Sequence, residues 1–270
     1  MFIHNINPVL VSLGPLDIRY YGVVYAIGFL VAYFLLRWAA KNNKIPNLNL
    51  ERADIFTIYL VIGGILGARL LLFVFYSPST FITDPLEIFK IWNGGMSFHG
   101  GLIGAVVAGL LFSKKYKVSF YKLGDFLVIP LAFFLFIGRI ANFINAELWG
   151  TITNSSLCID YSQSKYIINP PDGCRHPSQL YESAKNLLIF FVLSIIYFKE
   201  NIKNKLKDGF IFWSFVVMYG ILRFIITFWR DDPRFLGLSE GQYLSLAMAV
   251  LGIIMLFVIT RKHKKSKDKE

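Results

Sequence analysis

Long apolar stretches constrain this chain most, because a helix of about 20 apolar residues is needed to cross the hydrocarbon core of a bilayer. Of 270 residues, 55% are hydrophobic and 17% aromatic, which is too apolar for a soluble domain. If polar residues facing a bundle interior are allowed, the spans lie near 18–36, 54–76, 97–113, 123–142, 178–198, 209–229 and 241–260. The sequence therefore predicts an all-α, polytopic integral membrane protein with seven transmembrane helices in a single membrane domain, 1–270.

The positive charges lie in alternate loops. Lysines and arginines gather after the first, third, fifth and seventh apolar stretches, whereas the other connections are poor in lysine. Because cytoplasmic loops carry the excess of these residues, we expect the N-terminus outside and the C-terminus in the cytoplasm. The net charge of +11 then serves orientation, and the basic tail, 261–270, contacts anionic lipid headgroups rather than nucleic acid.

The longest external loop, near 151–175, is polar, and we expect it to form a small extracytoplasmic cap rather than a domain. Both cysteines, Cys158 and Cys174, lie in it, where an oxidising compartment permits a disulfide. A disulfide and two unpaired thiols remain equally open, because the sequence gives no distance between them. The four histidines are scattered and no metal-ligand spacing is present, so no metal is expected.

Polar residues interrupt the chain where hydrocarbon is expected, at 138–150, directly after an apolar run. If this segment is one helix, a single stripe contains Arg139, Asn142, Ala146 and Gly150. Glu147 then lies off one side of the stripe and Asn145 off the other. Charged residues within a membrane usually face a polar interior and mark a site. The small residues would let a ligand approach closely.

Two further predicted helices contain arginines. In the second, small residues at spacings typical of close helix packing precede Arg69, which either pairs with a carboxylate or lines the same polar interior as Arg139. In the sixth, spacings of four, four and three put four side chains on one face: Tyr219, Arg223, Thr227 and Arg230. Arg230 is close enough to the outer interface to snorkel, whereas Arg223 is too deep.

His99 is bracketed by glycines at the outer mouth of the third predicted helix, with Gly94 and Gly95 before it and Gly100 and Gly101 after it. Glycine pairs let a ligand approach the backbone, which makes Gly100 a candidate contact. A lone histidine is more often structural, but this one is a candidate for proton transfer because its unperturbed pKa is near neutrality. Tyr21, which opens the first helix, either belongs to an aromatic belt or contacts a lipid.

Together these side chains describe a polar cavity with a positive field, weighted toward the outer half of the membrane. Arginine suits phosphate because its planar fork makes two charge-assisted hydrogen bonds. The abundant phosphate-bearing molecule in a membrane is an anionic phospholipid. The residues alone therefore indicate a lipid-phosphate site and leave catalysis open.

Three motifs resemble those of the prolipoprotein diacylglyceryl transferases. They are Gly138-Arg139-x-x-Asn142-Phe143-x-Asn145-x-Glu147-x-x-Gly150, Gly94-Gly95-Met96-Ser97-Phe98-His99-Gly100-Gly101 and His176-Pro177-Ser178-Gln179-Leu180-Tyr181-Glu182. Tyr20-Tyr21-Gly22 and Tyr219-Gly220-x-x-Arg223 also match in type and order, so the resemblance covers nearly the whole chain. Thr227 departs, since the family commonly has an acidic residue there. That departure puts in question a charge pairing of Arg223 or Arg230 within the helix.

The resemblance implies the first step of bacterial lipoprotein maturation, in the cytoplasmic (inner) membrane. The diacylglyceryl group of phosphatidylglycerol passes to the lipobox cysteine thiol of a prolipoprotein, which forms a thioether and releases glycerol phosphate. Such a displacement needs no metal or organic cofactor. Arg139 and Arg223 would stabilise the leaving phosphate. His99 is the expected base, with Glu147 as a second candidate or as a partner that orients an arginine.

Other residues would bind substrate. Asn142 and Asn145 would hold glycerol or phosphate oxygens, and Tyr21 and Tyr219 would line the lipid path. Two readings from other classes compete with the enzyme: a transporter or flippase for an anionic solute or lipid, and a structural membrane protein with buried ion pairs. The absence of an internal repeat counts against the transporter. A purely structural role would leave the glycine-bracketed histidine unexplained.

Overall fold

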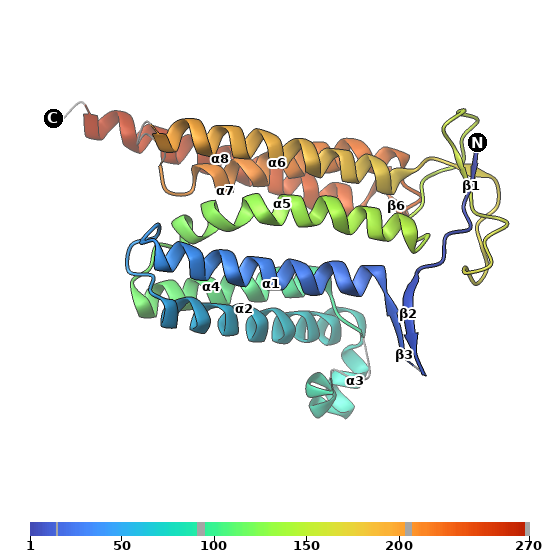
Figure 1. Cartoon of the computed structure of the whole chain (residues 1–270), viewed down its shortest axis with the longest axis horizontal. Coiled ribbons are helices and arrows are strands. Elements are labelled where there is room, and N and C mark those ends of the chain that lie inside the picture. The colour runs from blue at the N-terminus through green and yellow to red at the C-terminus, as the bar shows by residue number, and fades with distance from the viewer. Residues whose placement is uncertain (15, 91–94, 203–206, 268–270) are drawn as a thin grey trace. The chain divides into compact units, whose positions relative to one another are not determined.

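The computed structural model describes residues 1–14, 16–90, 95–202 and 207–267 (Figure 1). Within these ranges, six helices are long and apolar enough to cross a membrane. They are α1 (Tyr20–Lys41), α2 (Leu50–Leu71), α5 (Phe120–Ile144), α6 (Ser178–Ile202), α7 (Phe210–Ile226) and α8 (Glu240–Lys267). A π-helical turn, Leu72–Tyr76, continues α2, and a 3-10 turn, Thr227–Trp229, continues α7. The prediction of a helical multi-pass membrane protein is thus confirmed.

The expected third span corresponds to α4 (Phe98–Tyr116). Its 19 residues are long enough for a span, but its composition leaves it outside the six candidate spans, because His99 at one end and Lys114 and Lys115 at the other are polar. The seventh span and the orientation of the termini therefore stay predictions. Gly94, the loop lysines within 203–206 and the end of the basic tail, 268–270, lie outside the described residues.

The chain divides into two compact units. The first comprises residues 1–32 and 124–270, and the second comprises residues 33–123. In the first, a buried apolar core joins α5, α6 and α7 through Val128, Ala132, Ile189, Leu193 and Ile211. In addition, α8 packs closely on α7 at Gly220, where a methyl group would lie 2.7 Å from the carbonyl oxygen of Ser245.

In the second unit, α2 and α4 pack through glycines, as the small-residue spacing predicted. A methyl group at Gly63 would lie 2.5 Å from Cβ of Ala108, and one at Gly67 would lie 2.7 Å from Cα of Gly104. Gly100 faces the backbone of Gly67 in the same way. Only glycine lets these two helix backbones approach so closely. A short helix, α3 (Pro78–Thr83), and a 3-10 turn, Pro85–Phe89, follow α2.

Short strands form before the first helix and in the connections between later helices, which an all-α prediction did not include. β1 (Phe2–Ile3), β4 (Ile159–Asp160) and β5 (Cys174–Arg175) make one sheet in the order β1-β4-β5. β2 (Val9–Leu13) pairs with β3 (Leu16–Arg19), and β6 (Arg234–Phe235) pairs with β7 (Leu238–Ser239). Backbone groups outside helices need hydrogen-bond partners, and these ladders supply them.

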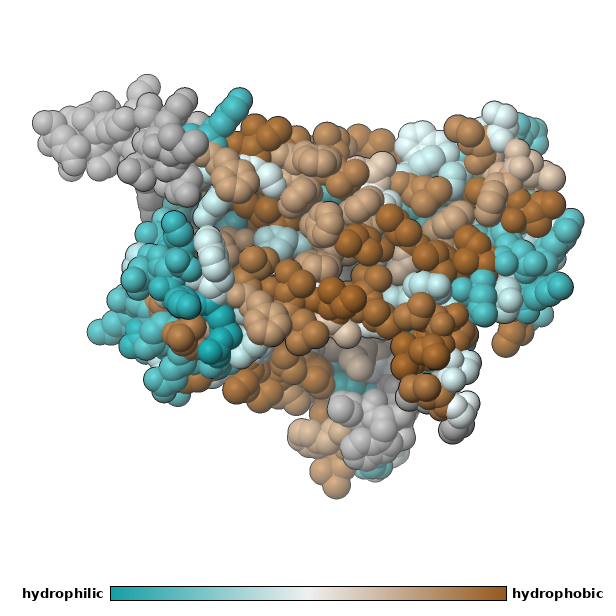
Figure 2. Space-filling model, in the orientation of Figure 1, coloured by the Kyte–Doolittle hydropathy of each residue, from teal (hydrophilic) through white to brown (hydrophobic). Residues whose placement is uncertain are grey.

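The expected cap at 151–175 is covalently closed. Cys158 and Cys174 form a disulfide with their Cα atoms 5.4 Å apart, which settles the alternative that the sequence left open. The N-terminal strand is fixed to this cap, because the amide of His4 donates to the carbonyl of Asp160 at 2.8 Å. On the face shown in Figure 2, hydrophobic side chains predominate along the helices and hydrophilic ones gather at their ends, as a bilayer requires.

Candidate functional site

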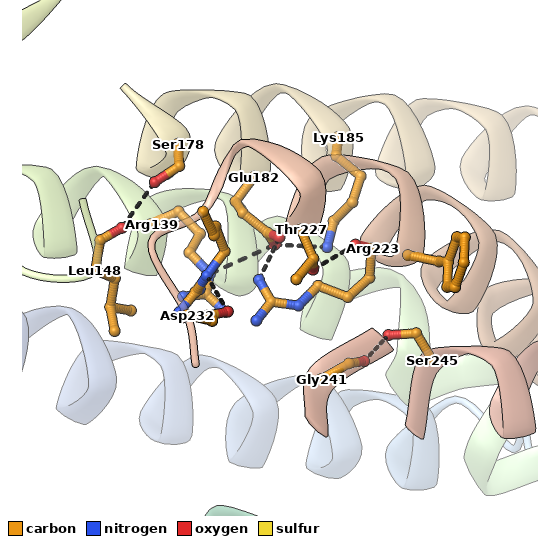
Figure 3. Close-up of polar contacts among 12 residues, drawn as sticks. Arg139, Leu148, Ser178, Glu182, Lys185, Arg223, Thr227, Asp232, Gly241 and Ser245 are labelled. Atoms are coloured by element: carbon orange, nitrogen blue, oxygen red, sulfur yellow. Dashed lines mark hydrogen bonds and ion pairs between the residues drawn. The ribbon is translucent and has the colours of Figure 1, made fainter. Parts of the chain in front are cut away.

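Glu182 is the centre of a charged cluster in the first unit. It lies on the second turn of α6 and is 1% exposed. Lys185, from the same helix, places Nζ 2.7 Å from Oε2 of Glu182, and Arg223 from α7 donates to Oε1. Arg139 from α5 places Nε 3.8 Å from Oε2. Three helices thus direct cationic side chains at one carboxylate (Figure 3).

The cluster carries more positive than negative charge. Three cations share one carboxylate, so the four side chains together have an excess of two positive charges. Excess charge in a membrane interior is unfavourable unless a counter-ion or ligand balances it. The side chains of Arg139 and Arg223 are 18% and 14% exposed, whereas those of Glu182 and Lys185 are 1% exposed. An anion would therefore meet the two arginines first.

Two residues of the face predicted for α7, Tyr219 and Arg223, lie in this cluster. The ring of Tyr219 lies 3.9 Å from Nζ of Lys185. The hydroxyl of buried Thr227 donates to the backbone carbonyl of Arg223 at 2.7 Å. Because Glu182 supplies the carboxylate for Arg223 from another helix, an acidic residue at position 227 is not needed for that charge pairing.

Arg230 does not snorkel to water. Its side chain is buried, and its Nε and Nη2 each lie 2.9 Å from a carboxylate oxygen of Asp232. Burial lowers the pKa of Arg230 from its ordinary value. The bidentate pair balances the charge of Arg230 locally, so this arginine adds no excess charge.

The expected helical stripe is wrong beyond Ile144, where α5 ends. Ala146 and Leu148 adopt left-handed backbone conformations, with φ of 54° and 57°. The amide of Ala146 donates to the carbonyl of Phe143 and that of Glu147 to the carbonyl of Asn142, both at 3.0 Å, which is the Schellman pattern of a helix end. Of the predicted stripe, only Arg139 and Asn142 share α5, where Arg139 donates to Oδ1 of Asn142 at 3.4 Å.

The turn after α5 brings Asn145 and Glu147 together. Nδ2 of Asn145 donates to Oε1 of Glu147 at 2.6 Å, and the side chain of Gln179 donates to the backbone carbonyl of Glu147. Oδ1 of Asn145 is buried and has no hydrogen-bond partner among the described residues. Such an acceptor is available to a ligand hydroxyl, because buried polar groups are normally paired.

Gly150 is enclosed by protein backbone instead of facing a ligand. A methyl group there would lie 2.5 Å from the carbonyl oxygen of His176 and 2.6 Å from that of Trp229. Its amide donates to His176, its carbonyl accepts from Arg175, and it bridges to Arg230. The small residue is therefore required for the cap to approach the end of α7.

Tyr21 lies beside α5 in the first unit. Its ring centroid is 4.5 Å from that of Tyr25, and the Tyr25 hydroxyl is 3.6 Å from where a methyl group at Gly138 would lie. The aromatic pair thus adjoins the residue that precedes Arg139.

Three predicted site residues belong to the second unit. Arg69 is buried and donates to a ring of backbone carbonyls: Ile88 at 3.1 Å, Gly95 at 3.1 Å, Lys90 at 3.0 Å and Glu87. Through these carbonyls it organises the loop before α4, which favours the structural alternative for this arginine. The backbone of α2 occupies the space next to Gly100, instead of a ligand. His99 is half-buried in the first turn of α4.

Comparison with known proteins identifies the family of this chain. The sequence model of the family described as prolipoprotein diacylglyceryl transferase matches residues 8–258. The chain belongs to the prolipoprotein diacylglyceryl transferase family. It is 39% identical to the phosphatidylglycerol–prolipoprotein diacylglyceryl transferase of Rickettsia canadensis, covering 97% of this chain and 100% of that protein. The same enzymes of Geobacter sulfurreducens and Bordetella avium are 38% and 40% identical, with 96% and 95% of this chain and 97% and 95% of theirs covered.

Within this member of the diacylglyceryl transferase family, sequence reasoning missed the centre of the site. Glu182 was noticed only as the last residue of a motif, and Lys185 was not singled out. A signal was present, because an acid and a base three residues apart in an apolar helix lie on one face and can pair. The order of the helices in space, which gives Glu182 its two arginines, had no such signal.

Proposed function

We propose that this protein transfers the diacylglyceryl group of phosphatidylglycerol to the lipobox cysteine thiol of prolipoproteins, the first step of bacterial lipoprotein maturation. Membership of the family supports this activity, and the observation that carries the site is the excess positive charge around Glu182. Phosphatidylglycerol and a prolipoprotein are the substrates. The protein acts in the bacterial inner membrane, with its site toward the outer half.

The reaction is a displacement at carbon. The cysteine thiolate attacks the carbon of the diacylglyceryl group that bears the phosphate. A carbon–sulfur bond forms, and the bond from that carbon to the phosphate oxygen breaks. The electron pair leaves on that oxygen, so glycerol phosphate is released, and the thiol proton passes to a base. The reaction consumes no oxidant or reductant.

Arg139 and Arg223 bind the phosphate in this proposal. The leaving phosphate gains negative charge as the carbon–oxygen bond breaks, and fixed cations in a low-dielectric site stabilise that charge. Glu182 holds the two guanidinium groups in position before the lipid arrives, because it pairs with both. Preorganised donors of this kind need no rearrangement during the reaction.

Two residues are candidates for the base that generates the thiolate. His99 offers an imidazole at the start of α4, but it belongs to the second unit. Glu147 is in the first unit and is oriented by Asn145. We retain His99 as the base and assign Glu147 to orienting Asn145, whose open acceptor, Oδ1, takes a glycerol hydroxyl. Full activity of a His99→Gln variant would overturn the first assignment.

The positions of the remaining predicted site residues suggest their roles. Asn142 lies one turn from Arg139 and shares its hydrogen bond, so it orients that guanidinium toward phosphate. Tyr21 and Tyr219 line the lipid path, beside α5 and beside Lys185. Arg230, bound by Asp232, fixes the outer end of α7, and we assign Gly150, Gly100 and Arg69 to packing.

The test uses purified protein, phosphatidylglycerol and a peptide with a lipobox cysteine, and follows the mass of the peptide. The expected result is a gain of one diacylglyceryl unit, with one glycerol phosphate released, and loss of both in an Arg139→Ala variant. A folded preparation that binds the lipid but leaves the peptide mass unchanged would contradict the proposal and favour a transporter.

A further inference from the structure

Lys185 is the one member of the charged cluster for which the proposed function gives no task. Its side chain is 1% exposed, and Nζ lies 2.7 Å from Oε2 of Glu182 (Figure 3). Nζ also lies 3.9 Å from the ring centroid of Tyr219. A buried ammonium needs strong compensation, and the carboxylate and the aromatic face supply it here. The geometry locks this lysine in one position.

The lysine changes the charge balance of the phosphate site. Without it, the two arginines and Glu182 would leave one excess positive charge, and with it they leave two. Arg230 does not alter this balance, because both of its carboxylate contacts come from Asp232.

The charge of the phosphate also changes during the proposed reaction. The phosphodiester of phosphatidylglycerol carries one negative charge. The released glycerol phosphate is a monoester with a second pKa of about 6, so it is largely dianionic at neutral pH. An excess of two positive charges therefore matches the leaving group better than it matches the bound lipid.

We propose that Lys185 is a positioning residue of the transfer reaction: by neutralising Glu182, it leaves the full charge of Arg139 and Arg223 for the dianionic leaving phosphate. This inference rests on the proposed function. An interaction that strengthens as the leaving group departs raises kcat, whereas uniform binding of lipid would change only KM. Lys185 therefore acts on kcat through its effect on Glu182.

The first test is a set of steady-state measurements on full-length variants. Lys185→Met should lower kcat by on the order of 10- to 100-fold with little change in KM for phosphatidylglycerol. Lys185→Arg, which keeps the charge, should retain most of kcat. Lys199→Met, at an exposed position near the end of α6, is the matched control and should behave like wild type.

A double variant separates charge from packing. Glu182→Gln combined with Lys185→Met restores an excess of two positive charges, while glutamine keeps an acceptor for Arg223. We expect its kcat to exceed that of Lys185→Met alone. A double variant no better than Lys185→Met, or a Lys185→Met variant with wild-type kcat, would overturn the inference. Absence of transfer activity in the wild-type protein would instead contradict the proposed function.

Inhibition of the wild-type protein tests the charge match without any variant. Glycerol phosphate should inhibit transfer at least about tenfold more strongly than its methyl diester, which carries one charge, because the site is balanced for two. Equal inhibition by the two compounds would overturn the proposed charge match even if Lys185→Met fails to fold.

Discussion

Arg223 on α7 donates a hydrogen bond to the carboxylate of Glu182 on α6, although the two residues are 41 positions apart. The carboxylate is buried and also forms ion pairs with Arg139 and Lys185. The position of Arg223 in the membrane is therefore fixed by another helix, and residue 227 in its own helix can be a threonine.

Glu182 should be essential for stability as well as for activity. Glu182→Ala leaves three cations without their carboxylate, and breaking a buried ion pair in this way destabilises by about 3–5 kcal/mol. Thermal unfolding in detergent should show this loss, together with loss of transfer. Asp54→Ala is the control, because Asp54 and Arg37 form a half-exposed pair at 2.6 Å, worth about 0–1 kcal/mol. Equal destabilisation by both changes would contradict the account.

The packing of α2 on α4 gives a second prediction. Gly67→Ala would place a methyl group 2.7 Å from Cα of Gly104, and overpacking of this kind destabilises by about 1–3 kcal/mol. Gly64→Ala, one turn earlier, meets only the carbonyl oxygen of Gly101 at 3.9 Å and gains helix propensity. The unfolding temperature should fall for the first variant and hold or rise for the second. A fall for both would mean that the helices do not pack through this seam.

The sequence was sufficient for the features that depend on local pattern. Apolar length located α1, α2, α5, α6, α7 and α8, and the spacing of small residues located the contact around Gly63 and Gly67. The helices α1, α6 and α8 run farther than their apolar cores, because lysine, arginine and glutamate continue a helix well outside hydrocarbon.

The features that sequence could not supply depend on tertiary contacts. The end of α5 was missed because Ala146, an excellent helix former, adopts the left-handed conformation of a Schellman turn, where glycine is expected. Gly150 was interpreted as an opening for substrate, whereas His176 and Trp229 fill that space from distant segments. The two carbonyls beside Gly150 have no sequence signature.

Reduction of the cap disulfide gives a third prediction. Cys158 and Cys174 close a loop with a sequence separation of 16. Loss of a cross-link over a loop of this length destabilises by about 3 kcal/mol. Limited proteolysis between the cysteines should therefore accelerate in a Cys158→Ser, Cys174→Ser variant, with the helices still protected. An unchanged cleavage rate would show that the short strands hold the cap without the disulfide.

The N-terminal strand should loosen in acid. His4 is fully buried, Nε2 lies 2.8 Å from the carbonyl oxygen of Phe143, and burial lowers the pKa of His4 below its ordinary value. The unfolded segment therefore binds a proton more readily than the docked one, so this contribution to stability is complete above about pH 6.5 and is lost as the pH falls through the lowered pKa. The hydrogen-exchange protection factors of residues 2–4, which correct for the intrinsic pH dependence of exchange, should fall between pH 7.5 and pH 5, and His4→Gln should remove most of that dependence. Equal pH dependence in variant and wild type would assign the effect to another group.

The central claim is that Arg139 and Arg223 bind the phosphate of the lipid. Equilibrium binding of phosphatidylglycerol to purified protein tests it without requiring transfer. Arg139→Ala and Arg223→Ala should each weaken binding by about tenfold or more, as expected for lost charge-assisted hydrogen bonds. Arg37→Ala, which removes an arginine paired with Asp54, should bind like wild type. Unchanged affinity in both Arg139→Ala and Arg223→Ala would contradict the account.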